Sequence, residues 1–155
     1  METQLFIRLK MNNKNFYFYL MEKPRIYCNG VFDLCHMGHI NIFKNAAMYG
    51  DVVVGVHSDE AVASYKRTPI QTMEERVEAV KHMKWVVEVI PDAPLITDME
   101  FMRKNNLDYI MISAEYDIPT DHYYKEPRAN GKILVVERYP YMSTSEIIKR
   151  IKERL

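Results

Sequence analysis

Residues 29–39 are the part of this chain best suited to chemistry on a phosphate. They read Asn-Gly-Val-Phe-Asp-Leu-Cys-His-Met-Gly-His and lead into a stretch with helical periodicity. A helix N-terminus offers free amides and partial positive charge to an anion, and Gly38 lets the backbone come close to it. His36 and His39 lie three residues apart, so both can donate hydrogen bonds to oxygens whose charge grows during a reaction. The segment therefore predicts a phosphate-binding site that carries out phosphoryl chemistry.

The same residue types also occur at sites of other kinds. Two histidines at the start of a helix can be ordinary surface residues, but their setting after a strand and between glycines favours a functional pair. Cys28, Cys35, His36 and His39 include the usual zinc ligands. Adjacent side chains at positions 35 and 36 diverge, which disfavours a shared tetrahedral site. The sequence therefore predicts no protein metal site.

Alternating strands and helices from residue 23 onward must position this loop. Short β-branched runs predict strands at 25–28, 51–57, 85–89, 109–112 and 132–136, with helical periodicity between them. This order predicts a Rossmann-like, doubly wound α/β fold: a mostly parallel five-stranded sheet with helices on both faces. Ligands of such folds bind beyond the carboxyl ends of the strands. The loops after residues 28, 57, 112 and 136 are therefore expected to form the site.

Four helices are predicted with particular ends. The first spans residues 38–49 and is expected to end with Gly50 as a left-handed C′ residue. Three later helices begin at sequences typical of a capping box, Thr72…Glu75, Thr97…Glu100 and Ser143…Glu146. The last helix has an apolar stripe that is expected to pack into the core, formed by Ile147, Ile148, Ile151 and Leu155.

Composition excludes several classes of function. The 155 residues are 48% hydrophobic, enough for one domain core, and 21 basic residues balance 21 acidic ones. Zero net charge argues against a protein that coats nucleic acid or an anionic membrane. No apolar run approaches the roughly 18 residues of a membrane span, and residues 1–4 lack the features of a signal peptide. We expect a cytoplasmic protein with one domain at 23–155 and an N-terminal appendage of unknown role at 1–22.

The pattern Gly30-x-Phe32-Asp33-x-x-His36-x-Gly38-His39 resembles that of the cytidylyltransferases in the HxGH nucleotidyltransferase superfamily. The likeness continues in the same order through residues 55–60, 66, 75–76 and 84–91, and it covers about residues 25–154. Within the superfamily the chain is most similar to the enzymes that make CDP-ethanolamine and CDP-choline. The resemblance implies transfer of CMP from CTP to a phosphoalcohol with release of pyrophosphate, Mg²⁺ bound to the triphosphate, and a homodimer.

The resemblance also implies roles for individual side chains. His36 and His39 would hold the α-phosphate, Lys66 would bridge the phosphates of the two substrates, and Arg138 would meet the triphosphate tail. Contacts with the nucleotide are expected from Gly30, Val31, Phe32, Asp33, Gly38, Ser113, Glu115, Ser143, Thr144 and Ser145. Contacts with the acceptor are expected from Lys84, Asp117 and Tyr124.

Residue types alone leave other roles open for several of these positions. Lys66 can be a solvated loop residue, and Lys84 can simply flank a strand. Asp33 can be a satisfied turn residue, and Arg76 can be a surface charge.

The acceptor is predicted from departures within this resemblance. The choline enzymes bind a quaternary ammonium with aromatic residues at positions that match Leu95, Thr120 and Tyr124, of which only the last is aromatic here. Asp117 and Asp121 would suit a primary ammonium. Phosphoethanolamine is therefore the predicted acceptor, with phosphocholine and glycerol 3-phosphate as alternatives.

Other departures concern the nucleotide. Tyr141 replaces a glycine of the family beside CTP, and Ser113-Ala114-Glu115 replaces the segment near the base. A nucleotide-binding module without turnover and an adenylyl transferase are therefore alternative functions. No nucleic acid or membrane partner is expected.

Overall fold

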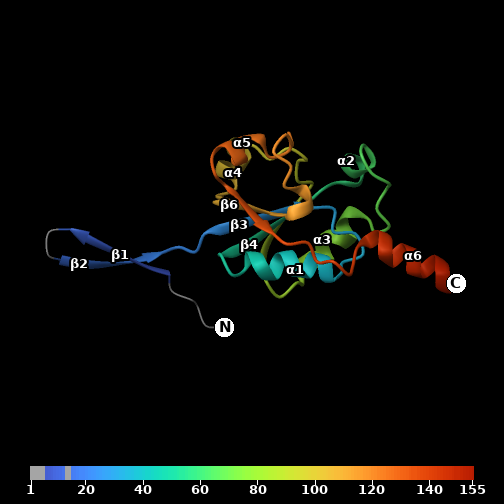
Figure 1. Ribbon diagram of the computed structural model, residues 1–155, viewed down its shortest axis with the longest axis horizontal. Helices are drawn as coiled ribbons and strands as arrows, with labels where there is room; N and C mark the ends of the chain where they lie inside the picture. The colour runs from blue at the N-terminus through green and yellow to red at the C-terminus, as the bar shows by residue number, and fades with distance from the viewer. Residues whose placement is uncertain (1–5, 13–14) are drawn as a thin grey trace.

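Five parallel strands form the central sheet of the computed structural model, which describes residues 6–12 and 15–155, with side chains from residue 22 onward (Figure 1). The strands are β3 (Arg25–Gly30), β4 (Asp51–Val56), β5 (Val86–Pro91), β6 (Tyr109–Ser113) and β7 (Ile133–Val136). Their order is β5-β4-β3-β6-β7, and every neighbouring pair is parallel. The chain thus moves outward from β3 first in one direction and then in the other, which confirms the predicted doubly wound sheet.

Helices cover both faces of this sheet, as predicted (Figure 1). On one face, α1 (Met37–Ala46) and α3 (Met73–Lys81) pack against a cluster that includes Val52 and Val54. On the other face, Val53 packs with Met102 of α4 (Met99–Lys104), and α5 (Lys125–Ala129) lies on the same side. Successive residues of a strand point to opposite faces, so the continuous valine run of β4 fills both halves of the core.

The end of α1 differs from the prediction. The helix stops at Ala46, and residues 47–49 form a turn before β4. Gly50 does not have a left-handed φ, so its predicted role as a C′ residue is wrong. A β-carbon there would lie 1.8 Å from the carbonyl oxygen of Pro24. Glycine is needed because the backbone passes so close to Pro24, whose oxygen accepts from the Asp51 amide at 2.8 Å.

The predicted capping box of α3 is confirmed. Thr72 Oγ1 accepts from the Glu75 amide at 3.3 Å, and Glu75 Oε2 accepts from the Thr72 amide at 2.9 Å. The box predicted at Thr97 is wrong, because α4 begins one residue later, and the carboxylate of Asp98 accepts from the Phe101 amide at 2.7 Å.

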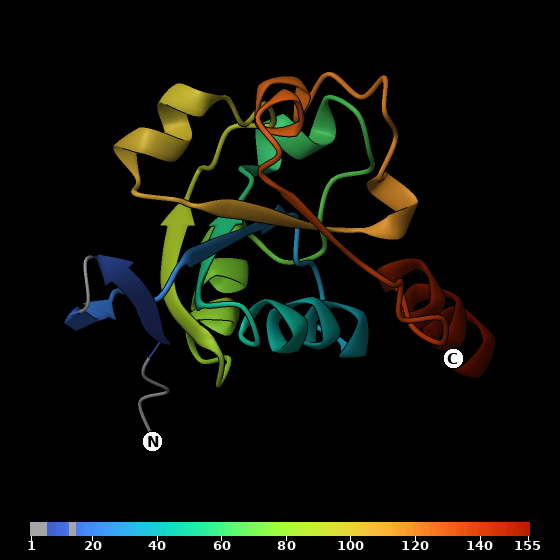
Figure 2. The ribbon, with the colours of Figure 1, turned by 60° about the vertical axis from the view of Figure 1, so that its left-hand side comes forward.

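Helix α6 (Thr144–Arg154) begins as predicted but packs differently. Ser143 Oγ accepts from the Glu146 amide at 3.1 Å, while the Glu146 side chain pairs with Arg150 rather than closing the box. No residue of α6 is buried, and Ile151 is 48% exposed, so the expected packing of its stripe in the core is wrong. The figures show the reason: the helix lies at the edge of the domain in Figure 2, and in Figure 1 it points outward, away from the sheet.

Three short helical segments and a second sheet complete the structure. Helix α2 (Asp59–Ala63) and the 3₁₀ turn η1 (Ala114–Tyr116) were not predicted, and neither was α5. Strands β1 (Phe6–Asn12) and β2 (Asn15–Met21) form a separate antiparallel sheet, which lies to the left of the α/β domain in Figure 1. Residues 1–4, used above to argue against a signal peptide, lie outside the described residues. Within the described ranges, no helix is long and apolar enough to cross a membrane.

Candidate active site

The loop from β3 to α1 has a strained backbone at the carboxyl edge of the sheet. Phe32 and Leu34 have left-handed φ values of 56° and 47°, which cost energy in residues that carry a β-carbon. Between them, the carboxylate of Asp33 is buried and accepts from the amides of Ile70 and Gln71, each at 3.0 Å. Strain of this kind persists where the surroundings enforce it and is frequent at functional sites.

The predicted histidine pair lies where this loop enters α1. The rings of His36 and His39 are stacked, with centroids 3.8 Å apart and planes 25° from parallel. His36 is the N-cap of the helix, and its Nδ1 accepts from the Gly38 amide at 3.0 Å. In a neutral imidazole this bond assigns the proton to Nε2. The rings of Phe32 and His39 form a T-shaped pair with centroids 5.2 Å apart, which helps to fix the second imidazole.

Burial keeps both imidazoles neutral. Burial, with a smaller contribution from the neighbouring His36, lowers the pKa of His39 to about 3. Burial also lowers the pKa of His36. Nδ1 of His39 is buried and has no hydrogen-bond partner among the described residues. At pH 7 the pair can therefore act as neutral N–H donors that are already in place.

The start of α6 docks on the same loop. Thr144 Oγ1 lies 3.4 Å from His36 Nε2 and 3.0 Å from the Asp33 carbonyl oxygen. With Nε2 protonated, the hydroxyl accepts from His36 and donates to Asp33. A β-carbon on Gly38 would lie 3.3 Å from the Met142 carbonyl oxygen and 2.8 Å from the His36 ring, so glycine permits this docking. Two segments more than a hundred residues apart thus meet at His36.

The two predicted basic residues lie at the exposed border of this region. Arg138 Nε pairs with Glu115 Oε2 at 2.9 Å, which joins the loop after β7 to the loop after β6. Lys66 Nζ lies 5.8 Å from the ring centroid of Tyr116, the residue next to Glu115. Ser113 lies two residues before Glu115, and its Oγ is buried with no hydrogen-bond partner among the described residues. The structure therefore brings Lys66, Glu115 and Arg138 to one region.

The predicted acceptor residues are in three different situations. Tyr124 is half-buried and its hydroxyl donates to Asn29 Oδ1 at 2.8 Å, at the end of β3. Asp117 pairs with Arg128 at 2.5 Å, so its charge is already balanced. Lys84 precedes β5 and therefore lies at the amino edge of the sheet, away from the other site residues.

The other residues predicted to contact the nucleotide lie at the ends of helices and strands. Gly30 is the last residue of β3, and the Val31 carbonyl oxygen accepts from Arg76. Ser143 serves as the N-cap of α6, and Ser145 is exposed in its first turn. These residues lie around the segment of residues 31–39 that carries the histidine pair, which we call the histidine loop. Their predicted contacts with a nucleotide stay predictions.

Comparison with known proteins decides the family. The family model described as cytidylyltransferase-like matches residues 27–150 of this chain. The chain belongs to the cytidylyltransferase-like family. It is 35% identical over 130 residues to the ethanolamine-phosphate cytidylyltransferase of Mus musculus, covering 82% of this chain and 32% of that one. It is 37% identical over 153 residues to the choline-phosphate cytidylyltransferase of Saccharomyces cerevisiae, covering 92% and 35%. The chain thus spans about a third of the length of the curated relatives it matches.

A solved structure supports the same fold. The lipopolysaccharide core biosynthesis protein from Thermoplasma volcanium GSS1 is similar with a TM-score of 0.63 and 26% identity, covering 76% of this chain and 98% of that one. The family inferred from the histidine motif is therefore confirmed, and so is the Rossmann-like α/β fold.

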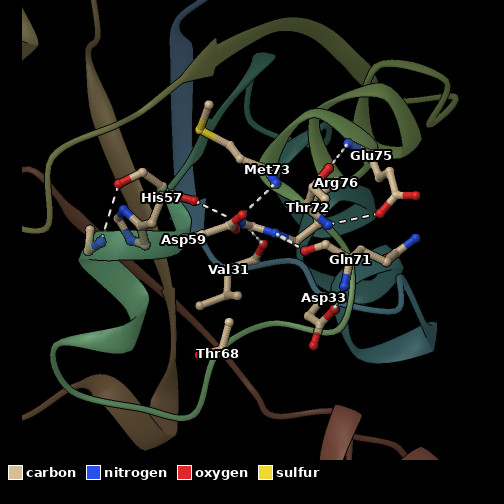
Figure 3. Close-up of polar contacts among 12 residues, drawn as sticks. Val31, Asp33, His57, Asp59, Thr68, Gln71, Thr72, Met73, Glu75 and Arg76 are labelled. Carbon is tan, nitrogen blue, oxygen red and sulfur yellow. Dashed lines mark hydrogen bonds and ion pairs between the residues drawn. The ribbon is translucent and has the colours of Figure 1, made fainter.

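Sequence reasoning missed three side chains of this cytidylyltransferase-like site. Asn29 precedes the motif but carries no pattern of its own, and Gln71, whose Oε1 accepts from the Leu34 amide at 2.8 Å, lies in an ordinary polar segment. Arg76, left open as a surface charge, is fully buried (Figure 3). Among the described residues, no group of three or more His, Cys, Asp or Glu side chains is placed to hold a metal ion.

Proposed function

We propose that this cytidylyltransferase-like chain transfers CMP from CTP to the phosphate of phosphoethanolamine, giving CDP-ethanolamine and pyrophosphate. The observation that carries the proposal is the stacked, neutral pair of His36 and His39 at the N-terminus of α1. Fixed neutral donors at a helix N-terminus suit an α-phosphate whose charge increases during the reaction. The names of the ethanolamine-phosphate and choline-phosphate relatives support this class of reaction.

The chemistry needs little acid–base assistance from the protein. The second pKa of a phosphate monoester is about 6, so at pH 7 the acceptor phosphate is mostly a dianion and is already a nucleophile. One of its oxygens bonds to the α-phosphorus of CTP. The bond from that phosphorus to the oxygen bridging to the β-phosphate breaks, and pyrophosphate leaves with the electron pair. The N–H of His39, and the Nε2–H of His36 once a phosphate oxygen displaces Thr144 from it, stabilise the charge on the non-bridging oxygens of the five-coordinate phosphorus.

The charged side chains of the site would bind the phosphates of the two substrates. Lys66 is exposed and can reach between the incoming phosphate and the CTP phosphates, while Arg138 can exchange Glu115 for the triphosphate tail. Mg²⁺ that arrives with CTP would neutralise the phosphates that leave. Such an ion keeps several waters and is bound largely by phosphate oxygens, so the donor set described here is compatible with it.

The acceptor is proposed from the same region. A quaternary ammonium is held by aromatic ring faces, and of the three positions predicted for such a cage only Tyr124 is aromatic, with its hydroxyl bonded to Asn29. Asp117 is paired with Arg128, and Asp121 Oδ1 accepts from the Tyr123 amide at 2.8 Å. Asp121 therefore remains as the carboxylate near this region for a primary ammonium.

Release of pyrophosphate from CTP and Mg²⁺ tests the proposal, with phosphoethanolamine, phosphocholine and glycerol 3-phosphate offered in parallel. We expect turnover with phosphoethanolamine, and His39→Ala should lower the rate about a hundred- to a thousandfold. His82→Ala is the matched control, because His82 is 75% exposed on the far end of α3 and should leave the rate unchanged. No release with any acceptor contradicts the reaction, and a preference for phosphocholine contradicts the acceptor.

The homodimer implied by the family and the cytoplasmic location expected from the sequence stay predictions. Sedimentation of the full chain, with and without CTP, tests the first. A mass of one chain at micromolar concentration under both conditions would contradict it.

A further inference from the structure

Arg76 of α3 is the largest side chain that is completely buried in the described part of the chain. A guanidinium without water needs partners for its charge and for its N–H groups. Nη2 donates to Asp59 Oδ1 at 2.5 Å and to the His57 carbonyl oxygen at 2.9 Å. Nη1 donates to the Val31 carbonyl oxygen at 2.6 Å, and Nε donates to that of Gln71 at 3.2 Å (Figure 3). One side chain thus joins the loop after β3, the end of β4, the start of α2 and the segment before α3.

Two of these segments carry the groups proposed to bind CTP. Val31 begins the strained loop that leads to the histidine pair. Residues 64–72 connect α2 to α3 and carry Lys66; we call them the Lys66 connection. Asp59 is the first residue of α2, and Gln71 lies two residues before α3, so the guanidinium binds on both sides of Lys66. The second oxygen of Asp59 accepts from the Met73 amide at 3.3 Å, which anchors this connection to α3 as well.

A second tie joins the same two segments from the other side. The Asp33 carboxylate accepts from the amides of Ile70 and Gln71, and Gln71 Oε1 accepts from the Leu34 amide. These contacts hold the loop in a left-handed conformation that its side chains disfavour. The loop and the Lys66 connection therefore depend on each other for their positions.

We propose that Arg76 is a positioning residue for CMP transfer. Its buried guanidinium fixes the histidine loop and the Lys66 connection relative to each other, so that both reach the phosphates of the same CTP. This inference rests on the proposed function. The side chain is 0% exposed, so it acts through the two segments and does not touch a substrate. Arginine is required because a lysine ammonium has one donor atom and cannot serve three carbonyl oxygens and a carboxylate from a planar fork.

Arg76→Lys in the full chain tests the proposal through kinetics. A misplacement of about 1 Å in a reacting group costs roughly a hundredfold, so we expect kcat for pyrophosphate release to fall about a hundredfold while KM for CTP changes less than about threefold. In a Lys66→Ala background the same substitution should cost at least tenfold less, because part of its effect is already lost. Additive effects of the two changes, or a kcat within threefold of wild type, would overturn the proposal.

Val80→Ala is the matched control for loss of stability. Val80 lies one turn further along α3 and is also fully buried, but it packs in the hydrophobic core. This variant should lower Tm at least as much as Arg76→Lys and keep kcat within about twofold. An equal loss of kcat in both variants would refute a positioning role. If Arg76→Lys does not fold, Asp59→Asn removes the charged partner and should lower kcat in the same way.

Hydrogen exchange separates this inference from the proposed function. In Arg76→Lys the amides of Ile70 and Gln71 should exchange at least tenfold faster than in wild type, whereas Val80→Ala should protect them nearly as well as wild type does. If wild type releases no pyrophosphate with any acceptor, the proposed function fails. Unchanged exchange at both amides would then still refute Arg76 as the tie between the two segments.

Discussion

The buried imidazole of His39 makes the stability of this fold depend on pH. Burial and the neighbouring His36 lower its pKa to about 3, whereas an unfolded histidine titrates near 6.5. Above pH 6.5 the imidazole is neutral in both states and contributes nothing to the dependence. As the pH falls from about 6.5 toward 3, the unfolded chain takes up a proton that the folded chain excludes. Acid should therefore lower the free energy of unfolding across this range.

The size of the effect follows from the difference between the two pKa values. One unit corresponds to about 1.36 kcal/mol, and pH 5 lies about 1.5 units below the unfolded value. His39 alone should therefore remove about 2 kcal/mol of stability between pH 7 and pH 5. Burial lowers the pKa of His36 and of His57 as well, so both act in the same direction.

Urea unfolding followed by circular dichroism at pH 7 and pH 5 measures this loss. Wild type should lose about 2 kcal/mol more than His39→Gln, because the substitution removes the titrating group and leaves the carboxylates in place. Val54→Ala is a control that is destabilised by packing alone, and it should lose as much between the two pH values as wild type. Equal losses for wild type and His39→Gln would refute the assignment of a buried, neutral imidazole.

Three further substitutions test local contacts by urea unfolding. Thr72→Ala should cost about 1 kcal/mol by removing the capping box of α3, and Thr72→Ser should restore most of it. Gly55→Ala places a β-carbon 2.0 Å from the hydroxyl of Tyr27 and should cost roughly 1–3 kcal/mol, of which adding Tyr27→Phe should recover a part. Tyr124→Phe should cost about 1 kcal/mol by leaving Asn29 without its donor. Effects below 0.3 kcal/mol would contradict each of the three contacts.

The sheet could be predicted because its information is local. The run from Val52 to Val56 is apolar at nearly every position, which is typical of a parallel strand covered on both faces. Between such runs, the Thr72 and Glu75 pair marks a helix start through contacts three residues apart. For β4 and for the start of α3 the decisive contacts lie within one element, and there the sequence was sufficient.

The prediction failed where a distant segment decides between local alternatives. Thr97 and Asp98 can both cap α4, but the Thr97 amide donates to the Tyr123 carbonyl oxygen at 2.9 Å, and its side chain is drawn into the core. That leaves the cap to Asp98. In α6, periodicity correctly identified an apolar face, but no periodicity shows whether another element covers that face, and Ile151 is exposed.

The residues of the candidate site also differ in whether local sequence was enough to predict them. The histidine pair could be found because both rings lie in one loop and its motif is contiguous. Arg76 could not be recognised, because three of its four partners lie 17, 19 and 45 residues away and only the fold brings them to one guanidinium. A buried arginine and a surface arginine have the same sequence signal when most of the partners are main-chain carbonyls and the one carboxylate, Asp59, is distant in sequence.

The distribution of charge allows such a site to fold and also suits the strongly anionic substrate proposed for it. Two imidazolium ions with centroids 3.8 Å apart would repel each other, so the buried pair is stable only as neutral donors. Formal positive charge resides instead on Lys66 and Arg138, which stay hydrated at the surface and cost little in the folded chain. Arg76, the one fully buried cation of the described residues, is compensated by Asp59. The fixed part of the site is thus neutral or paired, and the exposed side chains carry the positive charge that the proposed substrate CTP requires.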